Sequence, residues 1–168
     1  MDVLLFMKEE YSAIRAELPG LAPGDLAEAL VGAPLRRFMV RLELLVRVGG
    51  DLILPEVMDA GRSASAAALV AEDQLKGLGR IVAAFRKTGA LADAKRADVF
   101  RKVSAHVDQM ERAVLPLVRE LLPTAVREDI GEIALDYRSD FEAGSGKVKA
   151  STSASNASGR KSPATISA

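Results

Sequence analysis

Residues 106–116 read His-Val-Asp-Gln-Met-Glu-Arg-Ala-Val-Leu-Pro and contain the only histidine of the 168-residue chain. Apolar residues recur at intervals of three and four on both sides of this stretch, which is the period of an amphipathic helix. The helix predicted here covers 92–121. Its inward face is expected to consist of Val99, Val103, His106, Met110, Ala113 and Leu117.

The same period predicts further helices over 2–18, 35–59, 64–87 and 124–142, and a short one over 25–31. Pro55 is expected to kink or end the second long helix, and Thr88-Gly89 to close the third. The inward face of the second is expected to comprise Leu35, Phe38, Leu42, Leu45, Gly49 and Leu52. Strand signals are nearly absent. The predicted fold is therefore all-α: an up-down-up-down four-helix bundle, with an extra C-terminal helix across one end and a disordered tail.

The chain divides at a change of composition. Residues 1–143 are predicted to form the helical domain, whereas 144–168 are rich in Ser, Ala and Lys and nearly lack large apolar side chains. Such a segment cannot bury a core, so we expect a flexible tail. Gly144-Ser-Gly-Lys147 lacks the upstream glycine and the strand of a phosphate-binding loop, and it belongs to this tail.

Composition excludes several classes of function. The chain has no cysteine, which excludes disulfides, thiolate zinc sites and a cysteine nucleophile. Of its 23 basic residues, four lie in 144–168, so residues 1–143 carry 19 basic and 23 acidic residues, a net charge of −4. A weakly acidic domain argues against nucleic-acid binding. Neither a signal peptide nor a membrane-spanning run is expected, which favours a cytoplasmic protein.

Residues 106–116 resemble the last ligand-bearing helix of the haemerythrin-like (HHE cation-binding) family, which reads His-x-x-x-Glu-Glu before an apolar-Pro ending. The resemblance covers roughly 1–142 and is strongest over 99–137, where Arg119-Glu-Leu-Leu-Pro123 and Leu135-Asp-Tyr137 also match in style. It implies a four-helix bundle whose histidines and carboxylates hold two iron ions. In two of the helices a histidine precedes the carboxylate by four residues, which places both side chains on one helical face.

Laid onto this chain, the six ligand positions of that family are Tyr11, Leu45, Gly49, Glu72, His106 and Met110. Asp73 is the alternative to Glu72. Glu111 lies one residue beyond its ligand position, about 100° around an ideal helix. Because His106 alone keeps the family's ligand type, we expect the di-iron site to be lost. His106, Glu72 and Tyr11 are expected to meet, with a hydrogen bond between His106 and Glu72.

Two functions follow as hypotheses. The first is a non-enzymatic binding, scaffold or regulatory module without a cofactor, whose partner is an unidentified protein or small ligand. The second is a residual site at His106, Glu72 and Tyr11 that binds iron, haem or a small ligand for oxygen or redox sensing. The second predicts a cavity near Gly49 and His106, where the Gly49-Gly50 pair would leave space. The Ala- and Leu-rich helices suit either a monomer or a homodimer.

Overall fold

The computed structural model describes residues 1–22 and 30–154, including their side chains except for 62–65 and 145–154. These residues form helices and contain no strand, which confirms the all-α class. The helices are α1 (Val3–Glu17), α2 (Gly32–Arg47), α3 (Leu54–Ala60), α4 (Arg62–Thr88), α5 (Asp93–Gln109), α6 (Leu115–Leu121) and α7 (Thr124–Ala154). The short helix predicted over 25–31 falls mainly on 23–29, which lie outside the described residues.

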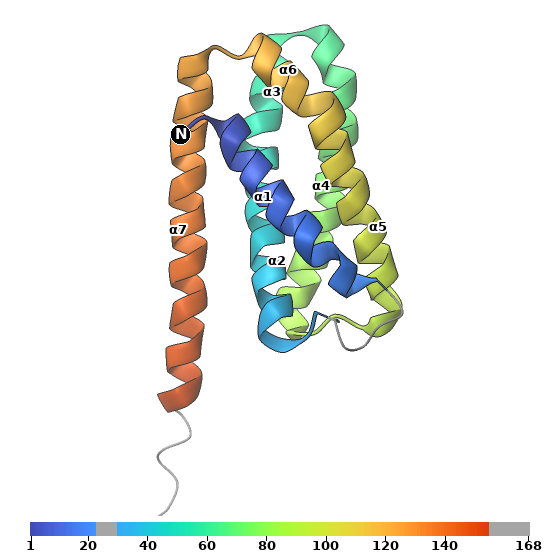
Figure 1. The fold of residues 1–168 in the computed structure, drawn as a ribbon, viewed down its shortest axis with the longest axis vertical. Helices are drawn as coiled ribbons and strands as arrows, with labels where there is room; N and C mark the ends of the chain where they lie inside the picture. The colour runs from blue at the N-terminus through green and yellow to red at the C-terminus, as the bar shows by residue number, and fades with distance from the viewer. Residues whose placement is uncertain (23–29, 155–168) are drawn as a thin grey trace, which may run out of the picture.

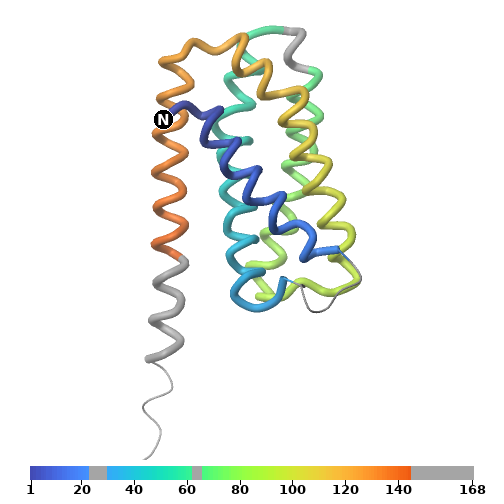
Figure 2. The backbone as a smooth tube through the Cα atoms, viewed as in Figure 1, coloured from blue at the N-terminus to red at the C-terminus, as the bar shows by residue number. Residues whose placement is uncertain are grey.

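The helices pack side by side around one apolar core (Figure 1). Helix α4 packs against α2, α3 and α5, and α1 packs against α2 and α7. The backbone trace places the N-terminus beside the upper part of α7 (Figure 2). Asp2 caps α1 by accepting a hydrogen bond of 2.8 Å from the Leu4 N–H. Gly89, with a left-handed φ of 66°, closes α4 as predicted.

Two π turns, η2 (Val48–Ile53) and η3 (Met110–Val114), join α2 to α3 and α5 to α6. In each turn the residue before a proline donates its N–H five residues back, from Leu54 to Gly49 and from Leu115 to Met110. In an α-helix the ring of a proline would clash with the carbonyl four residues earlier. The wider turn accommodates Pro55, and helix continues to Ala60, so the proline does not end the helix.

The π turns also shift the inward face of each long helix by one residue. Before η2 the predicted residues, such as Leu42 and Leu45, are buried, but after it Leu52 is half-buried and Ile53 is buried instead. Ala113 in η3 and Leu117 in α6 were predicted to face the core, but both are only half-buried. Their places in the core are taken by Val114 and Val118. Each shift by one follows from the i→i+5 bonding of a π turn, which adds one residue to the turn.

Helix α7 lies along α1 and α2, not across one end of the helices as predicted (Figure 1). Gly131 makes this possible, because a Cβ at that position would lie 1.8 Å from the carbonyl oxygen of Met1. Buried Ile130 and Ala134 extend the contact. The end helix of the prediction is therefore a side helix, positioned by a close approach that hydrophobic periodicity does not reveal.

A buried carboxylate links α7 to α1 and α2. Glu10 is 5% exposed, and its two oxygens accept hydrogen bonds from Arg41 Nε at 3.1 Å and from Arg138 Nη1 at 3.3 Å. The Arg138 guanidinium also lies 5.4 Å from the centre of the Phe6 ring. Both oxygens of Glu10 are thus satisfied, which offsets the cost of burying the charge.

Helix α7 runs eleven residues past the predicted domain boundary at 143, to Ala154. Backbone hydrogen bonding within a helix needs no apolar core, and Ala143, Lys147, Lys149 and Ala150 are good helix formers. The rest of the predicted tail, 155–168, lies outside the described residues.

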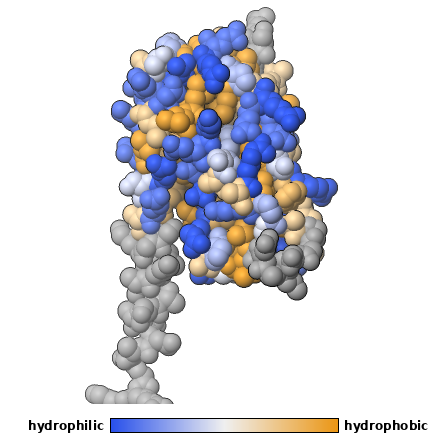
Figure 3. Space-filling model, viewed as in Figure 1, coloured by the Kyte–Doolittle hydropathy of each residue, from blue (hydrophilic) through white to orange (hydrophobic). Residues whose placement is uncertain are grey.

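The surface in Figure 3 is mostly hydrophilic, with hydrophobic residues in patches between charged ones. The exposed large apolar side chains include Leu5, Val31, Leu69 and Val70. Among the residues described, none of the helices combines the length and hydropathy required to cross a bilayer.

Candidate functional site

Tyr11 and His106 meet in the core between α1 and α5. Tyr11 is fully buried and His106 is 1% exposed, and their rings meet edge-on with centroids 6.4 Å apart. The Tyr11 hydroxyl and both His106 ring nitrogens have no hydrogen-bond partner among the described residues. These two predicted site residues are therefore brought together, as a polar pair in apolar surroundings.

Burial sets the protonation of this pair. It lowers the pKa of His106 to about 4, because the imidazolium form would lose its hydration. Burial also raises the pKa of Tyr11 well above its ordinary value, and the negative charge of Glu111 adds to that increase. At neutral pH both side chains are consequently uncharged. A neutral imidazole is the form that can accept a proton or bind a metal.

Glu72, the third predicted site residue, does not join them. It is only partly buried, and its carboxylate pairs with Lys76 one turn further along α4, at 2.8 Å. The predicted hydrogen bond between His106 and Glu72 is absent, since neither ring nitrogen of His106 has a partner among the described residues. The alternative residue, Asp73, is exposed. An exposed Lys76 ion pair keeps the Glu72 charge in solvent, which is cheaper than burying it beside a neutral ring.

Arg15 and Glu111 lie next to the pair and were not predicted as part of it. Arg15, one turn after Tyr11 on α1, donates hydrogen bonds to Glu111 and to Asp108 across the interface with α5. The hydrogen bonds that Arg15 donates to Glu111 and Asp108 raise its pKa. Ideal helical geometry placed Glu111 about 100° beyond its ligand position, but the π turn begins at Met110 and changes that count. The available sequence signal for this turn was Pro116, because a proline disfavours regular α-helix in the preceding turn, here Met110-Glu-Arg-Ala-Val114.

Apolar side chains fill the remaining positions of the resemblance. Leu45 and Met110 are almost completely buried. A Cβ on Gly49 would lie 3.0 Å from Leu75 Cδ1, so the side chain of Leu75 occupies the space beside this glycine. The hypothesis of a cavity near Gly49 is therefore wrong at Gly49 itself. Gly49 instead allows close packing of the η2 backbone against Leu75 of α4.

The side chains present do not fit a di-iron centre. Such a centre needs several carboxylate and imidazole donors around one point. Here His106 and Tyr11 meet without a carboxylate bonded to either, and the described part of the chain holds no group of three or more His, Cys, Asp or Glu suited to a metal ion. The side chains near His106 offer too few donor atoms to bind the two iron ions that the resemblance implies.

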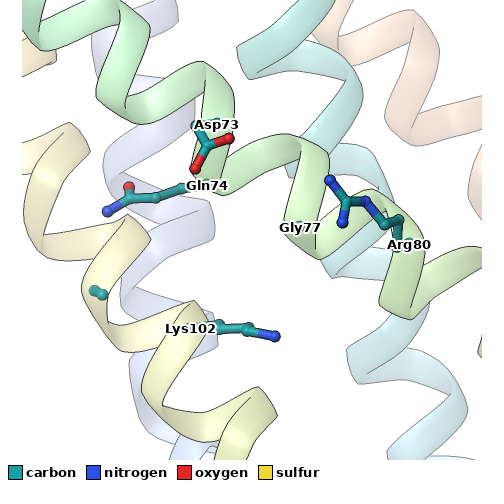
Figure 4. A pocket seen from close by; sticks show the side chains of 6 residues that line it. Asp73, Gln74, Gly77, Arg80 and Lys102 are labelled. Atoms are coloured by element: carbon teal, nitrogen blue, oxygen red, sulfur yellow. The ribbon is translucent and has the colours of Figure 1, made fainter.

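A second feature is a groove of about 400 Å³ between α4 and α5 (Figure 4). Gly77 and Ala105 line it with little side-chain volume, and Asp73, Gln74, Arg80 and Lys102 surround it. Lys102 pairs with Asp98 at 2.8 Å, and this contact lowers the pKa of Asp98. The groove is thus lined by one acidic and two basic side chains, Asp73, Arg80 and Lys102.

Comparison with protein-family models, with curated proteins and with solved structures finds no match to this chain.

Proposed function

We propose that this chain is a haemerythrin-like bundle of up-down-up-down topology, with α7 as an added helix, that has lost di-iron binding and acts as a non-enzymatic binding or regulatory module. The observation that carries the proposal is the packing at the positions of the lost ligands. Leu45 and Met110 are buried, and Leu75 fills the space beside Gly49. Apolar side chains thus fill three of the positions where the resemblance implies ligands or the space around them.

The two π turns support the same proposal. Each turn lies shortly before a proline. Each also begins at or beside a position that the resemblance assigns to a ligand, since η2 begins at Val48, next to Gly49, and η3 begins at Met110. π turns occur often at functional sites. Two such turns at ligand positions are what we expect of a bundle that keeps its backbone geometry after its metal-binding side chains have been replaced.

Metal analysis and an absorption spectrum of the full chain, purified from iron-supplemented cells, test the loss of iron. We expect colourless protein without stoichiometric iron, whose melting temperature does not change on addition of Fe(II). Stoichiometric iron, or a charge-transfer or Soret band that His106→Ala abolishes, would overturn the proposal. Tyr11→Phe separates the roles of the two rings, since a tyrosinate band would disappear in this variant and a histidine-bound haem would remain.

A residual ligand site is the second candidate, and the unpartnered nitrogens of His106 favour it. It would use His106 and Tyr11 to bind a metal, haem or small ligand. Glu72 could contribute only if its ion pair with Lys76 were broken. The absorption experiment distinguishes this candidate from the first, because only a residual site predicts a band or a thermal shift that depends on His106.

A further inference from the structure

We propose that the groove between α4 and α5 binds a small zwitterionic ligand, with its anionic group between Arg80 and Lys102 and its cationic group at Asp73. This goes beyond the function proposed above, because it assigns a ligand class and a place to a binding module. It involves none of the positions Tyr11, Leu45, Gly49, Glu72, His106 and Met110.

The charged groups around the groove are available to a ligand. Neither Arg80 nor Asp73 has an ion pair with any residue that the structure describes. Lys102 Nζ lies 2.8 Å from Asp98, but an ammonium has three donors and keeps some of them for a ligand. Figure 4 shows Arg80 and Lys102 extending from facing helices, with Asp73 further along α4. A guanidinium and an ammonium together suit a carboxylate or phosphate.

The spacing of opposite charges favours a ligand that carries both. Asp73 and Arg80 are seven residues apart on α4, which separates them by about 10 Å along the helix axis. At this separation they do not neutralise each other, and a molecule lying along the groove would meet a carboxylate at one end and cations at the other. The buried Gln74 Oε1, which has no partner among the described residues, adds an acceptor on the same wall.

The shape of the groove is consistent with a small molecule. Its volume of about 400 Å³ is within the usual range for ligand pockets. Gly77 and Ala105 let a ligand approach the helix backbones, and a Cβ at Gly77 would meet no atom within 4 Å. A larger side chain at Gly77 would therefore fill the groove without disturbing the packing of α4.

Isothermal titration calorimetry of the full chain with 6-aminohexanoate tests the proposal, with hexanoate and hexylamine as probes that carry one charge each. We expect saturable binding of 6-aminohexanoate with a Kd of about 1 mM or lower, and at least about tenfold weaker binding of either single-charge probe. Arg80→Gln, Asp73→Asn and Gly77→Leu should each weaken binding about tenfold or more. Lys87→Gln, a change of an exposed cation on the same helix, should leave binding unchanged.

Circular dichroism melting shows whether each variant is folded, and Gly77→Leu is the variant that best preserves the helix. Absence of saturable 6-aminohexanoate binding would overturn the proposal. Equal binding of hexanoate would also overturn it, because the groove would then be a simple anion site. The iron measurement is independent of these outcomes. Absence of ligand binding in the groove would not contradict the proposed loss of iron, and bound iron would not contradict the proposed groove site.

Discussion

The rings of Tyr11 and His106 meet at a steep angle with 6.4 Å between centroids, and this contact joins α1 to α5 inside an apolar core. Both side chains are almost completely buried, and neither hydrogen-bonds to the other or to another described residue. Unpartnered buried polar atoms cost free energy. Their effect on stability is therefore measurable.

Acidification should destabilise the fold through His106. In the folded state its pKa is about 4, below the ordinary value of 6.5, so between these values the unfolded chain takes up a proton that the folded chain does not. The free energy of unfolding therefore falls as pH decreases from 6.5 to 4, by at most about 3 kcal/mol. Urea unfolding followed by circular dichroism across this range measures the slope. In His106→Leu the slope should be much shallower; an unchanged slope would assign the effect to carboxylates.

Tyr11→Phe should be nearly neutral. The hydroxyl is buried without a described partner, so its removal leaves the ring packing intact and relieves a desolvation cost. We expect a change within about 1 kcal/mol, of either sign, in the free energy of unfolding. Tyr11→Ala, which removes the ring, should cost about 3–5 kcal/mol. A loss of more than about 2 kcal/mol in Tyr11→Phe would mean that the hydroxyl makes a hydrogen bond.

Gly131→Ala should loosen α7. The added Cβ would lie 1.8 Å from the Met1 carbonyl oxygen, which is backbone and cannot rotate away. We expect a loss of about 1–3 kcal/mol in unfolding free energy, with faster hydrogen exchange confined to α7 and the start of α1. Gly144→Ala on the same helix is the control, since its Cβ would meet nothing within 4 Å. That variant should gain up to about 1 kcal/mol. Equal effects in both would exclude the close contact.

Glu10→Gln should weaken the attachment of α7 more than Glu9→Gln. Glu10 is 5% exposed and bonds both Arg41 and Arg138, whereas the Glu9 side chain is 49% exposed and lies 4.0 Å from Arg138. We expect Glu10→Gln to cost about 1–3 kcal/mol and Glu9→Gln less than about 0.5 kcal/mol. Salt titration of the wild-type chain provides a second measurement, since buried pairs are screened less than exposed ones.

Apolar periodicity predicted the helical class and the core residues wherever the helices are regular. In α4 the apolar residues that recur every three or four positions are all buried, namely Ala71, Leu75, Leu78, Val82 and Phe85. The prediction failed where backbone geometry departs from the α-helix, because the count of 3.6 residues per turn does not hold across a π turn. It also failed for α7, whose position depends on the absence of a side chain at Gly131.

The candidate site was predicted only in part. The meeting of Tyr11 with His106 was expected from the resemblance, which assigns both residues to ligand positions of one site. Glu72 was expected inside because it stands at the position of a ligand histidine in the resemblance, but its neighbour Lys76 provides an ion pair at the surface. The groove between α4 and α5 could not be predicted, since it arises from the volumes of Gly77 and Ala105 across two packed helices.

Each π turn is equivalent to one residue inserted into an otherwise regular helix. A sequence whose helices lack these turns therefore aligns with this chain only if a one-residue gap is placed inside 48–53 and another inside 110–114. Without these gaps, Ile53 and Val114 would be matched to outward positions, and the halves of each long helix would be out of phase by about 100°. Relatives of this protein should be sought with gaps permitted in mid-helix, directly before the two prolines.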